Sequence, residues 1–295
     1  MNHTRLQIAK PDIIRTFEAL KSPVLKLGQI RSILAREREF WRLTQSISAA
    51  DLITFLTQHA KLQQIEFPFP RRAETLFIWG DVPAYTILLG LRPDAYFSHY
   101  TAMRLHGLTE QTSTTLYITD ERTAGAREAA ANLTQMNIDQ AFARPPRASH
   151  NTVVYEGRNV CLLNGAHTGQ LGVVTERVND DDGQDVEVRT SNLERTLVDI
   201  TVRPFYAGGL YEVAKAFELS RERISVNKLM TTLRKLDFSY PYHQAIGYYL
   251  ERAQFKSTQL DLARRIPIER DFYLTHDMGP TRYVSDWRLF VPEGF

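Results

Sequence analysis

Apolar side chains recur at the three- and four-residue spacing of helices in the first 60 residues. The first stripe is Ile13, Ile14, Phe17 and Leu20, the second is Leu27, Ile30, Ile33 and Leu34, and the third is Leu52, Ile53 and Leu56. Ser22-Pro23 ends the first stripe, because proline cannot continue a helix. Ser48 and Asp51 open the third, since their side-chain oxygens can accept from the free backbone N–H groups of a first turn. The pattern therefore predicts three helices.

Two strand-like runs follow, at residues 65–70 and 74–79, with Arg71, Arg72 and Ala73 as the turn between them. Pro68 and Pro70 favour an edge strand, because proline has no N–H to donate to a neighbouring strand. Three helices followed by two strands around an arginine-bearing turn are typical of a winged helix-turn-helix. We assign this predicted domain to residues 1–80.

In such a domain the third helix lies in the major groove of DNA, and the tip of the wing reaches a phosphate or the minor groove. The positions expected to face outward from the third helix are Ala50, Thr54, Thr57, Gln58 and Lys61. Threonine and glutamine can bond base edges, and lysine or arginine can reach phosphates. The predicted DNA-contact residues are Thr54, Thr57, Gln58, Lys61, Arg71 and Arg72. The same elements also occur in modules that bind only protein, so that alternative stays open.

Charge favours a nucleic-acid contact at the front of the chain. Residues 1–80 hold 12 Lys/Arg and 7 Asp/Glu, a balance of +5. The whole chain carries +2, so the remaining 215 residues sum to −3. A basic front attracts a polyanion through Coulomb forces and counterion release, although ordinary scatter of surface charge gives a similar imbalance.

Residues 81–190 read as a mixed α/β domain. A helix is expected at residues 96–105, with Ser98 as its cap and Gly107 as its stop, and a strand at residues 114–119. Residues 152–155 and 159–163 read as a hairpin around Glu156-Gly157-Arg158. An alanine-rich, exposed helix is expected at residues 124–136, and an acidic, solvated loop at residues 176–187.

Residues 191–295 read as mainly helical. Ser191 and Glu194 have the spacing of a capping box, and further helices are expected at residues 210–219, 226–236 and 241–253. The aromatic segment from residue 271 to residue 295 is strand-like. The fold class expected for the whole chain is α+β.

No catalytic signature emerges. The chain lacks a glycine-rich phosphate loop and a dinucleotide fingerprint, and its only cysteine, Cys161, lies in an apolar run. His99 and His106 have no third ligand nearby, so we expect them to be core or hydrogen-bonded histidines and expect neither metal nor cofactor. Arg195 and Asp199 are four residues apart and are expected to pair on one helix face.

Two alternatives remain at this point. The first is a metal-dependent nuclease, whose carboxylates would be Asp185, Glu187 and Glu194. A protein-binding adaptor is the other alternative. With no run of about 20 apolar residues and no leader at its start, the chain reads as a cytoplasmic protein without a membrane partner.

Three segments resemble the AbiEi-type antitoxins of type IV toxin–antitoxin systems. They are SHYTAMRLHGLTEQ from Ser98, LERTLVDITVRPFYAGGLYEV from Leu193, and YPYHQAIGYYLERA from Tyr240. The resemblance extends from the predicted winged helix to the closing WRLFVPEGF from Trp287.

The resemblance implies an N-terminal winged helix and a C-terminal antitoxin domain. It also implies a function: autorepression of a phage-defence operon by binding of double-stranded promoter DNA, and neutralisation of a nucleotidyltransferase toxin that does not require a stable complex. A DNA-binding repressor rather than an enzyme is therefore expected.

Overall fold

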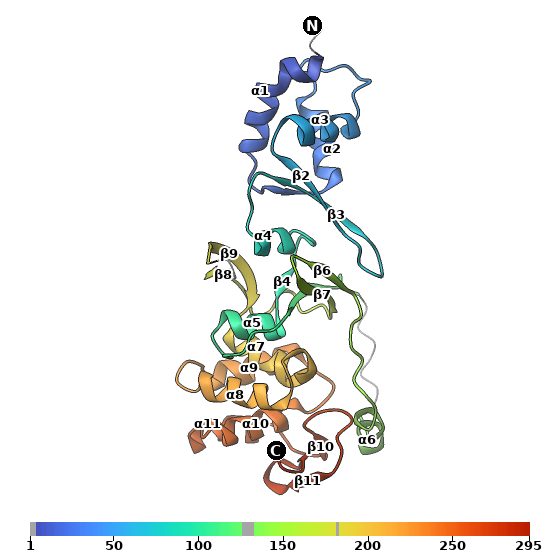
Figure 1. Ribbon diagram of the computed structural model, residues 1–295. Coiled ribbons are helices and arrows are strands. Elements are labelled where there is room, and N and C mark those ends of the chain that lie inside the picture. Colours follow the sequence, from blue (N-terminus) through green and yellow to red (C-terminus); the bar gives the residue numbers. More distant parts are fainter. Residues whose placement is uncertain (1–3, 126–132, 181–182) are drawn as a thin grey trace. The chain divides into compact units, whose positions relative to one another are not determined.

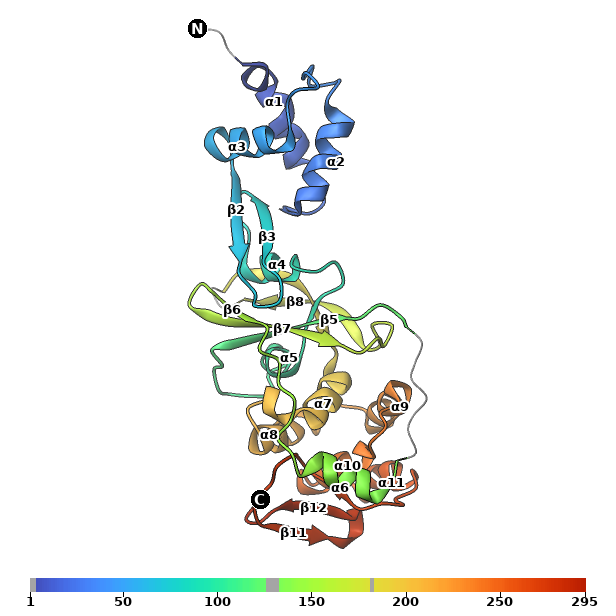
Figure 2. The same ribbon diagram turned by 90° about the vertical axis from the view of Figure 1, so that its right-hand side faces the viewer.

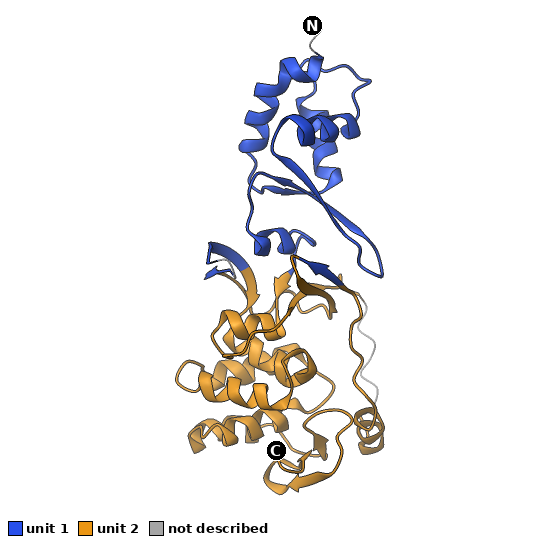
Figure 3. Cartoon of the chain, viewed as in Figure 1, with its two compact units in different colours: residues 1–95, 153–155, 177–188 blue, residues 96–152, 156–176, 189–295 orange. Residues whose placement is uncertain are grey.

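The computed structural model of the protein describes residues 4–125, 133–180 and 183–295. The chain divides into two compact units (Figure 3). Unit 1 contains Met1–Ala95, Val153–Tyr155 and Arg177–Val188. Unit 2 contains Tyr96–Thr152, Glu156–Glu176 and Arg189–Phe295.

Unit 1 begins with the three expected helices, drawn in blue in Figure 1: α1 (Arg5–Glu18), α2 (Leu27–Glu37) and α3 (Ala49–His59). Each helix buries most of the stripe that predicted it, because apolar residues three and four apart share one face, whereas Leu27 at the start of α2 is exposed. The fully buried members include Ile13, Ile30, Leu52 and Leu56. These side chains form one core with Trp41 and Leu43 from the segment between α2 and α3.

A three-stranded antiparallel sheet shares the core of these three helices. Its order is β1 (Val24–Leu25), β3 (Glu74–Trp79), β2 (Leu62–Phe67), with Leu62 opposite Trp79 and Phe67 opposite Glu74. The second predicted strand is confirmed. The first was placed three residues too late, since Pro68 and Pro70 lie in the loop after β2, where no ladder hydrogen bond is required of them. A short helix, α4 (Ala84–Leu89), follows the sheet.

The longest sheet has the order β6-β7-β5-β4-β9-β8. Its strands are β4 (Tyr96–Phe97), β5 (Thr115–Glu121), β6 (Thr152–Tyr155), β7 (Arg158–Gly165), β8 (Val173–Asn179) and β9 (Asp185–Ser191). β5 runs parallel to β7 and antiparallel to β4, with Thr115 opposite Asn159 and Tyr96 opposite Thr119. The predicted hairpin around Gly157 is present, and positive φ angles at Glu156 and Gly157 allow its two-residue turn.

The structure differs from two of the predictions for this region. The acidic segment at residues 176–187 is not a loop, because most of it belongs to β8 and β9; only its tip connects them, and Asp181 and Asp182 lie outside the described residues. Val186 and Val188 are buried while Asp185 and Glu187 are exposed, which is the alternation of a half-buried strand. The predicted alanine-rich helix falls largely on residues 126–132, outside the described residues, and a described helix, α6 (Gln135–Phe142), follows them.

The helix predicted at residues 96–105 is shorter in the structure: Tyr96 and Phe97 form β4, and α5 (His99–Leu105) follows. Gly107 ends it with a φ of 63°, as expected.

The three later helices are confirmed as α8 (Leu210–Ser220), α9 (Val226–Leu236) and α10 (Tyr242–Arg252). The helix opening the region, α7 (Leu193–Val202), is capped differently from the prediction. Ser191 still belongs to β9, so Asn192 is the cap, and its side chain accepts from the backbone N–H of Arg195.

Helix α11 (Ser257–Arg264) was not predicted. The strand-like end of the chain is confirmed as β10 (Phe272–Tyr273), β11 (Thr281–Val284) and β12 (Leu289–Pro292), and Figure 2 shows β11 beside β12. Helices and this small sheet bury one large core that includes Leu197, Phe217, Ile246 and Trp287. The fold is therefore mixed α+β, and no helix among the described residues is long and apolar enough to cross a membrane.

Candidate nucleic-acid interface

Helix α3 presents one buried and one exposed face. Leu52, Phe55 and Leu56 pack into the core of unit 1. Thr54, Thr57 and Gln58 are exposed, as is Ala50 one turn earlier. These positions, three of them with hydrogen-bonding side chains, belong to a polar surface of α3 that also includes the exposed Asp51 and His59.

The start of α3 is fixed by a complete capping box. The Ser48 hydroxyl accepts from the Asp51 N–H at 3.2 Å, and the Asp51 carboxylate accepts from the Ser48 N–H at 2.8 Å. The Ser48 side chain and backbone hold the pKa of Asp51 below its usual value, because both donate hydrogen bonds to the ionised carboxylate. The capped turn sets the direction in which the exposed side chains of α3 point.

Arg38 holds the segment between α2 and α3 through hydrogen bonds, a role that the sequence did not reveal. Its guanidinium donates to the carbonyls of Thr44 and Ile47, the latter at 2.9 Å. Trp41 and Leu43, from the same segment, are buried. The segment between α2 and α3 is thus anchored at both its backbone and its side chains, which positions the capped end of α3.

The polar side chains on α3 differ in how far they are already engaged. The Thr57 hydroxyl donates to the Ile53 carbonyl at 2.9 Å, so it offers an acceptor to another molecule. The Gln58 side chain makes no hydrogen bond with the described residues. Its amide therefore keeps both a donor and an acceptor for a partner, which is the combination that pairs with adenine in the major groove.

Lys61 was predicted on the outward face of the third helix, and this is wrong in detail. The helix ends at His59, and Ala60 is extended, so Lys61 lies beyond it. Its ammonium stands 3.5 Å from a carboxylate oxygen of Glu18, with both side chains more than half exposed. An exposed pair of this kind is weak, and Lys61 stays accessible to a phosphate.

Arg71 and Arg72 lie in the exposed loop between β2 and β3, as predicted. Arg72 Nε is 3.9 Å from Glu74 Oε1, whereas Arg71 has no ion pair among the described residues. Glu74 is buried and is held mainly by Lys26 Nζ at 2.9 Å and Arg92 Nη1 at 2.8 Å. Burial acts to raise the pKa of Glu74, but Lys26 and Arg92 outweigh it and keep the pKa below its usual value. The base of the loop is therefore fixed while its two arginines remain at the surface.

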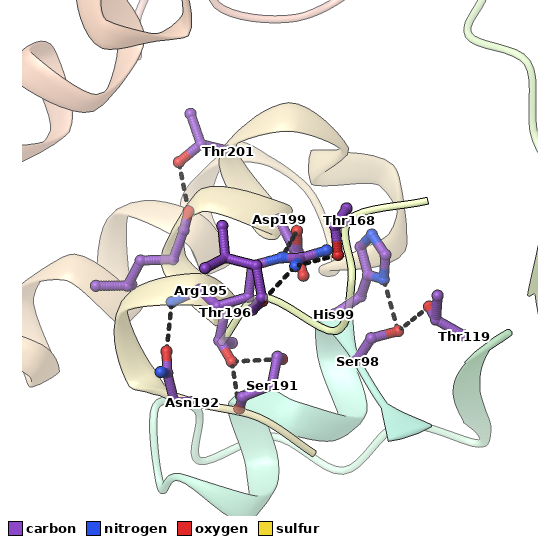
Figure 4. Close-up of polar contacts among 12 residues, drawn as sticks. Ser98, His99, Thr119, Thr168, Ser191, Asn192, Arg195, Thr196, Asp199 and Thr201 are labelled. Carbon is purple, nitrogen blue, oxygen red and sulfur yellow. Dashed lines mark hydrogen bonds and ion pairs between the residues drawn. The ribbon is translucent and has the colours of Figure 1, made fainter. Parts of the chain in front are cut away.

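The main group of charged side chains in unit 2 is buried. Arg195 Nε donates to Asp199 Oδ1 at 2.7 Å, confirming the predicted pair, and both side chains are less than a tenth exposed. The same guanidinium donates to the Leu171 carbonyl at 2.6 Å and to the Tyr96 hydroxyl at 3.4 Å. Figure 4 shows Arg195 beside Asp199 and Thr168. Burial raises the pKa of the Asp199 carboxyl, and the Arg195 charge opposes this effect.

Glu121 extends this buried group, a connection that the sequence did not indicate. Its carboxylate accepts from the backbone N–H of Thr168 at 2.8 Å, from that of Gln170 at 3.3 Å and from the Thr168 hydroxyl. The loop of Thr168 and Gln170 is thereby joined to β5 and α7. These charges connect β5, α7 and the loop before β8 within unit 2.

Two of the three carboxylates considered for catalysis, Asp185 and Glu194, form ion pairs, whereas Glu187 is exposed. Glu194 accepts from Lys228 Nζ at 2.9 Å and from the Ser225 N–H at 3.3 Å. Asp185 pairs with Arg177 at 3.3 Å. No cluster of three or more histidine, cysteine, aspartate or glutamate side chains that could hold a metal ion occurs within the described ranges.

His99 and Cys161 are core residues. His99 Nδ1 lies 2.9 Å from the Ser98 hydroxyl, and burial lowers the pKa of His99 to about 3. Burial raises the pKa of the Cys161 thiol, which keeps it protonated. Neither group has the exposure or charge that a nucleophile or base requires.

Comparison with known proteins gives a likeness of fold. No family model and no curated protein matches the chain. The crystal structure of the RV2827C protein from Mycobacterium tuberculosis is similar, with a TM-score of 0.56 and 13% sequence identity over 96% of this chain and 91% of that one. At this identity the similarity concerns the fold alone.

Proposed function

We propose that the protein is an antitoxin and a sequence-specific, DNA-binding repressor of its own operon, in which unit 1 carries a winged helix-turn-helix. The proposed reading helix is α3, and the proposed wing is the β2–β3 hairpin. The observation that carries the proposal is the outer face of α3, where Thr54, Thr57 and Gln58 are exposed on a helix fixed by its cap.

The order of elements in unit 1 supports this assignment. Helix α1, strand β1, helices α2 and α3, and the hairpin β2–β3 follow one another as in winged helix-turn-helix domains. In those domains the third helix inserts into the major groove, and its exposed side chains reach base edges. A capped helix favours such recognition because its backbone is already ordered before binding.

Charge supports a phosphate contact by the wing. Residues 1–80 carry a balance of +5, and two exposed arginines occupy the loop at the end of the hairpin. Each phosphate contact made by Lys or Arg releases counterions, which strengthens binding at low salt.

The antitoxin role rests on the resemblance of the Ser98, Leu193 and Tyr240 segments to AbiEi-type antitoxins. These segments form α5, α7 and α10, which pack into the core of unit 2. On this proposal unit 2 carries the neutralisation of a nucleotidyltransferase toxin, and unit 1 carries operator binding.

The DNA-binding part is tested by titrating the protein's own promoter and a random duplex of equal length in a mobility-shift assay at several salt concentrations. The promoter should bind more tightly, and binding should weaken steeply with salt. Arg71→Ala with Arg72→Ala should weaken both duplexes and flatten the salt slope by up to about two units, because up to two phosphate contacts are lost. Arg221→Ala, an exposed arginine of unit 2, is the matched control. Equal affinity for promoter and random DNA at physiological salt would exclude a sequence-specific repressor.

The antitoxin part is tested in cells. The nucleotidyltransferase toxin that the proposal assigns to the same operon is expressed from a separate promoter, at constant dosage, with each variant. The double arginine variant should still rescue growth while losing repression. Loss of rescue by this variant, in a folded state, would contradict the division of roles between the units.

A further inference from the structure

The exposed face of α3 carries a restricted set of side chains. The helix contains neither arginine nor lysine from Ala49 to His59. Arginine and lysine make the commonest base-specific contact in the major groove, with N7 and O6 of guanine. The outer face of α3 carries small or amide side chains instead, at Ala50, Thr54, Thr57 and Gln58. This face therefore lacks the groups that most often select a G·C pair.

The two other exposed residues of α3 are engaged with the protein itself. Asp51 Oδ2 accepts from the Ser48 N–H at 2.8 Å and from the Ser48 hydroxyl at 2.7 Å, so this carboxylate is held at the cap. His59 is the last residue of the helix, and its ring lies against that of Phe55, with 5.0 Å between the centroids. Contact with bases is therefore assigned to the alanine, the two threonines and the glutamine.

These four side chains lie along one side of the helix. Residues 50, 54, 57 and 58 are separated by three and four positions, which places them above one another. At 1.5 Å per residue, the stretch from Ala50 to Gln58 is about 12 Å long. Base pairs stacked at roughly 3.4 Å fit about three to four times into this length. The face of α3 therefore matches one short run of consecutive base pairs.

The hydrogen-bonding groups on this face match adenine. The Thr57 hydroxyl donates to the Ile53 carbonyl at 2.9 Å, so its oxygen is left as an acceptor. Guanine presents only acceptors in the major groove, whereas adenine presents its N6 amino group as a donor beside its N7 acceptor. The Gln58 amide offers both a donor and an acceptor, which is the pairing that adenine N7 and N6 require. Thr57 thus disfavours guanine, and Gln58 favours adenine.

The methyl groups on the same face match thymine. The side chain of Ala50 is a single methyl group, and Thr54 and Thr57 each carry one. Thymine presents a C5 methyl group in the major groove, and alanine and threonine methyl groups make apolar contact with it. Cytosine has no methyl group at that position. Both kinds of contact therefore favour an A·T pair over a G·C pair.

We infer that the operator presents a short run of A·T pairs to α3. Gln58 recognises adenine through N7 and N6, and the methyl groups of Ala50, Thr54 and Thr57 contact the thymine methyl groups. This inference rests on the proposed insertion of α3 into the major groove, and it adds the class of base pair that the helix selects.

The experiment measures binding of the full-length protein to its own promoter by fluorescence anisotropy, with single groups deleted from the major groove. Four forms of the duplex are compared: unmodified, with 7-deazaadenine for adenine, with uracil for thymine, and with 7-deazaguanine for guanine. Each replacement keeps Watson–Crick pairing but removes adenine N7, the thymine methyl group or guanine N7. A random duplex with the same replacements controls for effects on the shape of the DNA.

The parent protein should lose about tenfold in affinity with 7-deazaadenine, the effect of losing one base contact. Uracil should weaken binding to a smaller extent, and 7-deazaguanine should leave the affinity unchanged. Gln58→Ala should lose most of the sensitivity to 7-deazaadenine, because its contact with N7 is already absent. Gln140→Ala, at an exposed glutamine on α6 in unit 2, is the matched control and should keep the parent's sensitivity. Both glutamines are exposed, so neither variant should change the melting temperature.

The inference is overturned if 7-deazaguanine weakens promoter binding as much as 7-deazaadenine does. It is also overturned if the folded Gln58→Ala variant remains as sensitive to 7-deazaadenine as the parent. In both cases the repressor proposal stands, provided that the unmodified promoter is bound more tightly than the random duplex. Equal affinity for these two unmodified duplexes would contradict the proposed function itself, and this inference with it.

Discussion

The outer face of α3 in unit 1 and the Arg195 group in unit 2 use polar side chains in opposite ways. On α3, Thr54, Thr57 and Gln58 are exposed. In unit 2, Arg195 and Asp199 are buried and bonded to each other, and Arg195 also bonds to the loop before β8. The side chains on α3 keep hydrogen-bonding groups free for a partner, whereas those of the Arg195 group are engaged in bonds that stabilise the fold.

The difference separates binding from stability. Exposed side chains contribute little to folding, so their replacement should change affinity with little effect on unfolding. A buried ion pair has already lost its hydration, so removing one partner leaves an uncompensated charge. The predictions below test this separation.

Arg195→Met should have the largest effect. It removes the guanidinium from Asp199, from the Leu171 carbonyl and from the Tyr96 hydroxyl, and should lower the free energy of unfolding by about 3–5 kcal/mol. Urea unfolding followed by circular dichroism measures the change. Arg221→Met, at an exposed pair with Glu222, should cost less than about 0.5 kcal/mol. Similar losses for both variants would show that the buried group does not dominate the stability of unit 2.

Gly247→Ala tests packing in the same unit. A Cβ at this position on α10 would lie 2.1 Å from a ring carbon of the fully buried Trp287. Overpacking of this kind should cost about 1–3 kcal/mol, measured by the same unfolding curves. Gly28→Ala on α2 is the control, because nothing lies within 4 Å of its added Cβ. An unchanged midpoint for Gly247→Ala would mean that Trp287 does not pack there in solution.

A smaller effect on stability is expected in unit 1 when the pH is lowered, through Asp51. The pKa of Asp51 is lowered in the folded state by its hydrogen bonds with Ser48. A carboxylate of this kind stabilises the fold above its unfolded pKa of about 4, and the contribution is lost as the pH falls through the lower folded value. Asp51→Asn should therefore be less stable than the parent at pH 6, and its stability should fall less steeply between pH 6 and pH 3. Thermal unfolding at each pH measures this. Glu39→Gln, at an exposed residue between α2 and α3, is the control for removing one negative charge and should leave the stability at pH 6 unchanged.

Much of the fold could be predicted from local patterns. Helices α1, α2, α3, α8, α9 and α10 follow apolar stripes, and caps such as Ser48 and Ser225 mark where α3 and α9 begin. The β8–β9 hairpin was missed because its exposed carboxylates outweighed the alternation of Val186 and Val188. Strand β1 and helix α4 are too short to give a periodic signal.

The candidate site could be predicted only in part. The exposure of Thr54, Thr57 and Gln58 follows from helical spacing, since the apolar face of α3 fixes the opposite one. Lys61 was misplaced because the sequence does not show that the helix ends at His59. Arg38 and Glu121 could not be found, since each acts on groups brought close only by folding. The Arg195–Asp199 pair was foreseen because both residues lie on one helix, but its burial was not.

The central claim is that the outer face of α3 reads DNA sequence, and Gln58→Ala tests it most directly. Affinities of the parent and the variant for the promoter and for a random duplex are measured by fluorescence anisotropy at physiological salt. The account predicts a loss of roughly 1–3 kcal/mol on the promoter, much less on random DNA, and an unchanged melting temperature. Equal losses on both duplexes, or no loss on the promoter for this variant and for Thr54→Ala, would contradict it.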